Sequence, residues 1–118
     1  MSTDELINRY QAGERDFKEI KLAQVDLSGV DLSGADLSVA DMAGADLSEA
    51  NLSGANLSGA ILKGSNLTGA DLTGADLSWA DLGMANLTGA NLADANMNMS
   101  ILIRTRFKNT IMPDGSKR

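Results

Sequence analysis

Aspartate carboxylates are the side chains of this sequence whose spacing could best support chemistry. They recur at five-residue intervals in two stretches of the chain, and those that form a predicted acidic surface are Asp26, Asp31, Asp36, Asp41, Asp46, Asp71, Asp76 and Asp81. Paired carboxylates can perform acid–base catalysis or bind a hard divalent cation. We expect neither role, because such an even spacing places them on a flat, solvated wall without a pocket or converging carbonyl oxygens.

Other catalytic groups are missing from the sequence. The chain has 118 residues and contains no His and no Cys, which excludes imidazole bases, thiolate nucleophiles, Cys/His zinc sites and disulfides. The glycine-containing stretch from Gly54 to Ile61 lacks the Lys-Ser/Thr ending of a phosphate-binding loop. A single domain without enzymatic activity, cofactor or metal is therefore expected.

Charge is unevenly distributed along the chain. The formal net charge is −6, and residues 22–100 contain ten acids and only one base, Lys63, whereas residues 101–118 contain five bases and one acid. This balance argues against ordinary nucleic-acid binding. The sequence shows neither a secretory signal nor an apolar run long enough to cross a membrane, so we expect a cytoplasmic protein without a membrane partner.

Apolar residues occupy every fifth position from Phe17 to Met112, mostly as leucine. A small residue, usually Ala, lies two positions before each of them, Asp or Asn lies between, and Ser or Thr and often Gly follow. A helix is excluded because steps of about 100° per residue would scatter a five-residue repeat around its axis. A long flat strand is excluded because an odd period alternates between its faces. The pattern favours short extended pieces joined by corners, with Ala and Leu inside a tube and Asp or Asn outside.

Units such as Ala35-Asp36-Leu37-Ser38-Val39 and Ala55-Asn56-Leu57-Ser58-Gly59 resemble those of the pentapeptide-repeat family. The resemblance implies an all-β solenoid, a right-handed quadrilateral β-helix with four units per coil and about five coils, which would be on the order of 24 Å long. We assign residues 15–114 to this β-helix and residues 115–118 to a C-terminal tail. Residues 1–14 form an N-terminal cap, in which Ser2 to Glu5 offer a capping box and a helix is predicted from Asp4 to Ala12.

One part of the outer surface is predicted to be apolar. Residues twenty apart share a column of the stack, and one column contains Val39, Gly59, Trp79 and Met99. Ile61 and Ile101 lie beside the same corner, and Met84 and Ile103 extend the edge. A protein-interaction patch is therefore predicted, and it consists of Val39, Ile61, Trp79, Met84, Met99 and Ile101. In the alternative interpretation, Trp79 lies flat over Gly59 as a local packing cap.

We therefore predict a rigid, non-enzymatic scaffold that binds an unidentified protein through its outer surface. The alternative comes from pentapeptide-repeat proteins of the gyrase-protecting type, whose acidic rod resembles duplex DNA; it is an inhibitor or protector of DNA gyrase or of another DNA-handling enzyme. Asn residues interleave with the Asp residues, and both could simply solvate the wall. The Asn-x-Ser/Thr triplets, as at Asn56, follow from the repeat and are not interpreted as glycosylation sites. The basic C-terminal end leaves a monomer or an end-to-end homodimer as the expected states.

Overall fold

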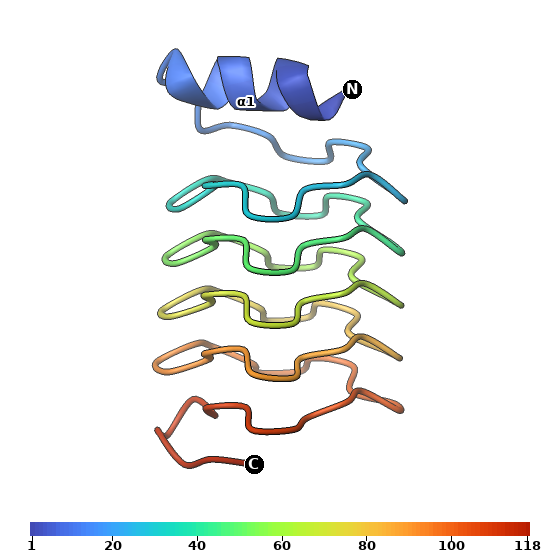
Figure 1. Ribbon diagram of the computed structural model, residues 1–118, viewed down its shortest axis with the longest axis vertical. Coiled ribbons are helices and arrows are strands. Elements are labelled where there is room, and N and C mark those ends of the chain that lie inside the picture. Colours follow the sequence, from blue (N-terminus) through green and yellow to red (C-terminus); the bar gives the residue numbers. More distant parts are fainter.

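The computed structural model describes residues 1 to 118, and a short helix covers one end of the molecule (Figure 1). This helix, α1, spans Thr3–Gln11, within one residue of the predicted bounds at each end. Ser2 caps it by accepting a hydrogen bond from the backbone N–H of Glu5 at 3.2 Å, as the predicted capping box requires. Leu6 is fully buried and belongs to the apolar core, so α1 acts as a lid on the stack.

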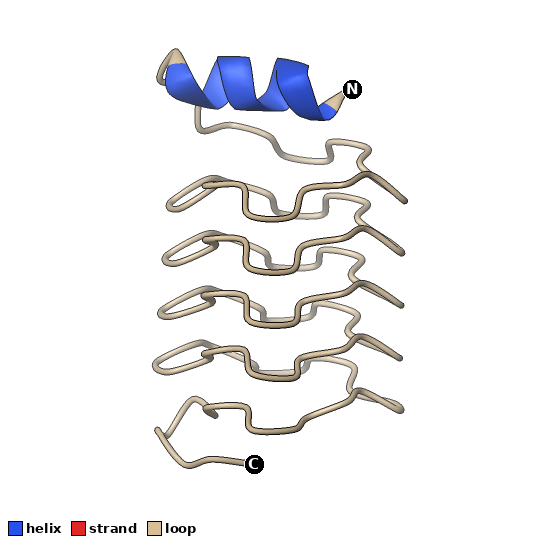
Figure 2. Ribbon diagram, viewed as in Figure 1, coloured by secondary structure: helices blue, strands red, loops and turns tan.

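Beyond α1 the chain winds into a solenoid of stacked coils without continuous strands (Figure 2). The sheet pairing of the stack consists of isolated parallel bridges that each join residues twenty positions apart, from Asp16 with Asp36 to Asn91 with Ile111. A twenty-residue coil holds four five-residue units and therefore has four sides. No strand becomes longer because a turn follows every bridge. The hand of the winding and the number of coils stay predictions.

Each five-residue unit closes with a tight turn. The backbone N–H of the small residue donates to the carbonyl of the preceding apolar residue, as from Ala55 to Leu52 at 3.0 Å. The residue just before the small one has a positive φ, for example 65° at Gly54, and glycine adopts this conformation without steric cost. This requirement explains the many glycines of the sequence.

The Asp and Asn side chains stabilise the same turns. Asp36 Oδ1 accepts hydrogen bonds from the backbone N–H of Ser38 at 3.1 Å and from its hydroxyl at 2.7 Å. Asn56 Oδ1 accepts the same two bonds from Ser58, at 3.0 and 2.7 Å. Both residue types supply the same acceptor oxygen, so either can fill the position. Beyond the predicted solvation of the wall, these side chains thus hold the turns together.

The interior of the stack is filled by the predicted inward residues. The apolar residue of every unit from Leu22 to Leu92 has no exposed surface, and the alanines between them, such as Ala55, are almost completely buried. Burying one leucine side chain contributes about 2 kcal/mol. The three hollows of the molecule lie on the outer wall, at the C-terminal tail and beside α1, while buried side chains fill the tube itself.

One polar side chain lies in this interior. Ser65 occupies an alanine position, is 1% exposed, and its hydroxyl has no hydrogen-bond partner. An unsatisfied buried hydroxyl is destabilising, so Ser65→Ala should raise the free energy of unfolding by about 1 kcal/mol. Chemical denaturation monitored by circular dichroism measures this change. A less stable Ser65→Ala variant would mean that the Ser65 hydroxyl makes a favourable contact inside the tube.

The two ends of the solenoid differ. Leu102 was predicted to fill the tube but is 38% exposed, because no further coil covers it. Instead, the chain turns at Pro113 to Gly115 and returns, so that Lys117 forms an antiparallel bridge with Ile111. The molecule measures 36 × 23 × 22 Å. Its long axis exceeds the length predicted for the coils alone, and α1, whose diameter is about 10 Å, accounts for much of this difference. None of its helices could span a membrane.

Candidate functional site

The outer face of one of the four sides lacks the turn hydroxyl groups that predominate on the other three. We call it the hydroxyl-free side, and it consists of residues 21–25, 41–45, 61–65, 81–85 and 101–105. At the turn position where Ser or Thr predominates elsewhere, its column contains Ala23, Ala43, Lys63, Gly83 and Ile103. Asp41 and Asp81 consequently accept only the backbone N–H of Ala43 and Gly83, at 3.1 and 2.9 Å. The departure runs through this whole column, whereas the other three sides show it only at single positions such as Ala93 and Asn98.

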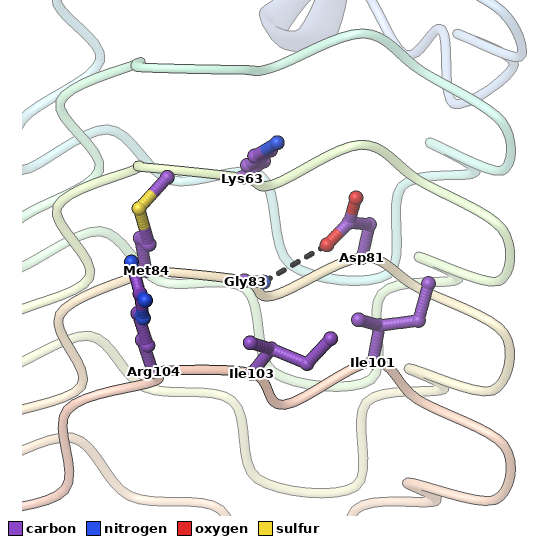
Figure 3. A pocket seen from close by; sticks show the side chains of 7 residues that line it. All are labelled: Lys63, Asp81, Gly83, Met84, Ile101, Ile103 and Arg104. Atoms are coloured by element: carbon purple, nitrogen blue, oxygen red, sulfur yellow. Dashed lines mark hydrogen bonds between the residues drawn. The ribbon is translucent and has the colours of Figure 1, made fainter.

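A groove of about 430 Å³ lies on the C-terminal half of the hydroxyl-free side (Figure 3). Its lining residues are Lys63, Asp81, Gly83, Met84, Ile101, Ile103 and Arg104. The φ of Gly83 lies outside the left-handed region of positive values, so the backbone does not require glycine at this position. A Cβ atom at this position would stand 3.0 Å from Asp81 Oδ1 and 3.9 Å from Lys63 Cγ. The missing side chain thus opens the floor of the groove between an acid, two bases and aliphatic walls.

Exposed apolar side chains gather on this same side and at its two corners. Apart from Met1, all large apolar residues that are exposed lie there, namely Val39, Ile61, Trp79, Met84, Met99, Ile101, Leu102 and Ile103. The structure therefore brings together the six residues of the predicted patch. Ile103, which is 69% exposed, and Leu102 and Gly83 were not among those six. Ile103 was noted from the sequence as extending the edge of the patch, whereas Leu102 has the inward position of its repeat and gave no such signal.

Trp79 does not pack over Gly59. It is 66% exposed, and the only atom within 4 Å of the position of a Cβ on Gly59 is Val39 Cγ2, at 3.5 Å. Trp79, Met84 and Met99 also occupy corner positions with φ of 62°, 58° and 62°. A non-glycine residue in this region costs about 1 kcal/mol, so glycine would serve the fold better. These side chains are therefore not explained by the stability of the solenoid.

The predicted acidic residues are spread over all four sides and do not converge. Asp36 and Asp76 belong to one side, Asp41 and Asp81 to the next, and Asp26 with Asp46 and Asp31 with Asp71 to the other two. No three carboxylates come together in a way that could hold a metal ion. Hydrogen bonds from the backbone N–H and the hydroxyl of Ser28 lower the pKa of Asp26, and equivalent bonds lower the pKa of Asp31 and Asp36. These bonds favour the ionised form of the three carboxyl groups.

This geometry defines a class of repeat protein, a solenoid whose side chains meet other molecules only on its outer surface. The sequence matches the family model of pentapeptide repeats, with eight copies, over residues 16–54, 50–83 and 70–109. The chain therefore belongs to the pentapeptide-repeat family.

Solved structures of the family resemble this chain along most of its length. A pentapeptide repeat protein from the thylakoid lumen of Arabidopsis thaliana is 42% identical with a TM-score of 0.74, and the match covers 76% of this chain. The chain spans 63% of the length of that protein. One from the cyanobacterium Cyanothece 51142 is 28% identical with a TM-score of 0.76, and the match covers 94% of this chain and 99% of the other. A comparison with curated protein sequences finds no match.

Proposed function

We propose that this chain is a non-enzymatic protein-interaction module that binds another protein through the C-terminal half of its hydroxyl-free side. The observation that carries the proposal is the gathering of the exposed apolar side chains on that one side and its corners. Aromatic residues and Met are enriched in protein interfaces, and burying Trp79 and Met84 would supply the central contacts. Lys63 and Arg104 offer charged contacts around the groove.

The strained corners support the same function. Glycine occupies the corner position at nine places, including Gly59 in the column of Trp79. A bulky side chain there lowers stability without filling the core, so its benefit has to come from another contact. The rigid stack holds these side chains in fixed positions, which limits the conformational entropy lost on binding.

The experiment compares two double variants that are matched in their backbone conformation. The chain is immobilised and exposed to a lysate of the cells that express it, beside Trp79→Ser/Met84→Ser and Glu49→Ser/Asp94→Ser. Glu49 and Asp94 occupy the same corner position, with φ of 60° and 61°, but on other corners of the coil. We expect the wild type and the Glu49/Asp94 control to retain the same protein and the Trp79/Met84 variant to lose it. Equal retention by all three would overturn the proposal.

Duplex mimicry is the alternative function, and a supercoiling assay with DNA gyrase distinguishes it from binding through the hydroxyl-free side. A mimic would inhibit the supercoiling activity of gyrase, would lose this effect as salt rises, and would not need Trp79. The spread of the acidic residues over four sides, with Asn at intervening positions such as Asn56 and Asn66, does not favour this function. Binding of a protein through the hydroxyl-free side should tolerate salt.

A further inference from the structure

The end of the stack opposite α1 has backbone donors without acceptors. In the coil before the last, the N–H groups of the residues that face this end donate to carbonyls of the next coil at 2.7 to 3.0 Å; these residues are Leu77, Trp79, Leu82, Met84 and Leu87. The equivalent groups of the last coil donate to no acceptor of the chain, and they belong to Met97, Met99, Leu102, Arg104 and Phe107. We call residues 97–107 the open edge. An unpaired edge of this kind is a template for an added strand.

The tail leaves the open edge uncovered. Its backbone hydrogen bonds join Arg118 to Thr110 and Ser116 to Met112, so it lies along residues 110–112. The guanidinium of Arg118 reaches further and lies 4.8 Å from the ring centroid of Phe107. Leu102 remains 38% exposed, whereas Leu82 directly above it in the stack is fully buried. An apolar side chain of a partner could therefore complete the core over Leu102.

The charges around the open edge indicate what kind of chain could bind there. All five bases of the C-terminal region are exposed, and they are Arg104, Arg106, Lys108, Lys117 and Arg118. None of them forms an ion pair, because the single salt bridge of the structure joins Arg9 to Glu14. A second copy packed end to end would bring ten bases and only two acids together, since each copy has five bases and one acid, Asp114, in residues 101–118. Like charges at close range disfavour that dimer, and an acidic partner removes the repulsion.

We propose that the open edge binds an acidic segment of another protein, which pairs with its backbone by strand addition and turns with the coil at each corner. The segment accepts hydrogen bonds from the backbone of residues 97–107, covers Leu102 with an apolar side chain, and places its carboxylates near Arg104 and Arg106. This site shares Arg104 with the groove on the hydroxyl-free side, but its free backbone N–H groups lie at the end of the stack, so the edge can bind a segment whether or not the groove binds a protein.

The test uses a labelled peptide that carries the chain's own spacing of leucine with added acids, ADLDEADLDEA. Its fluorescence anisotropy is titrated with the full chain, with Arg104→Glu/Arg106→Glu, and with the control Lys18→Glu/Lys21→Glu, which makes the same charge change near the other end. We expect binding that weakens about tenfold or more in the Arg104/Arg106 variant and stays unchanged in the control. The Trp79→Ser/Met84→Ser variant should also bind the peptide normally, which separates the open edge from the proposed binding surface on the hydroxyl-free side.

Two further measurements distinguish strand addition from simple charge attraction. The bound peptide should slow amide hydrogen exchange of Met97, Met99, Leu102, Arg104 and Phe107, as measured by NMR. A peptide with serine in place of leucine, ADSDEADSDEA, should bind about tenfold more weakly. Absence of binding, equal binding of both peptides or unchanged exchange of these amides would overturn the proposal. So would a dimer in sedimentation equilibrium that slows the exchange of the same amides without peptide, because a second copy would then occupy the edge.

Discussion

Replacing Ala55 by leucine is expected to lower the free energy of unfolding by about 3 kcal/mol. The midpoint temperature of thermal unfolding should fall by roughly 10 °C. Ala55 is 1% exposed and faces the interior beside the fully buried Leu57. Ala35 and Ala75 occupy the same column in the coils above and below, so the new side chain has neither an empty space nor a flexible neighbour to displace. Overpacking must therefore force the coils apart or twist other side chains out of their rotamers.

Asn56→Leu is the matched control, because it introduces the same side chain one residue further on and outside the wall. Isoleucine occupies this outward position at Ile61 and Ile101, which shows that the backbone accepts an aliphatic residue there. The control loses the two hydrogen bonds that Asn56 accepts from Ser58, at a cost of about 1 kcal/mol or less because the site is on the surface. Thermal unfolding followed by circular dichroism compares the two variants. Equal destabilisation by both would mean that the alanines do not fill the interior.

The interior could be predicted from the sequence because side-chain volume and period together admit only one arrangement. A leucine every fifth residue with alanine two positions earlier fits a narrow tube, and Leu57 and Ala55 lie where this argument puts them. The prediction fails at Leu102, since burial depends on a neighbouring coil and the five-residue pattern does not say where the stack loses its cover. The position of a residue in the repeat determines whether its side chain points inward, whereas burial of that side chain also requires a neighbouring coil.

The outer surface was predictable only in part, for a different reason. Trp79 and Met99 were found because twenty-residue spacing identifies columns, and the exposure of both follows from their corner position. The turn role of Asp and Asn was missed, although the triplet Asn56-Leu57-Ser58 contains both the acceptor and the donor. Such a contact depends on the backbone conformation between the two residues, which composition and period do not specify. Gly83 was missed because glycine looks ordinary in a glycine-rich repeat.

Gly83→Ser should raise stability and weaken partner binding at the same time. Serine restores the regular unit, and its hydroxyl can donate to Asp81 Oδ1 as Ser78 donates to Asp76 Oδ1 at 2.6 Å. The carboxylate must shift by a few tenths of an ångström from the Cβ contact of 3.0 Å, which the unit at Asp76 and Ser78 already accommodates. A glycine replaced at an unstrained position and one added hydrogen bond should together contribute about 1 kcal/mol.

The same substitution fills the floor of the groove, so a partner side chain seated between Met84 and Ile103 loses its space. We expect affinity for the protein captured by the wild type to fall about tenfold, measured by titration calorimetry, while the midpoint temperature rises by about 4 °C.

Ala93→Ser is the control, because it adds the same hydroxyl beside Asn91 on another side of the coil. It should be slightly more stable than the wild type and bind equally well. If Gly83→Ser also bound equally well, the groove would not contact the partner. A solenoid selected for stability alone would carry serine at this position, so opposite changes in stability and affinity would identify Gly83 as a residue retained for binding.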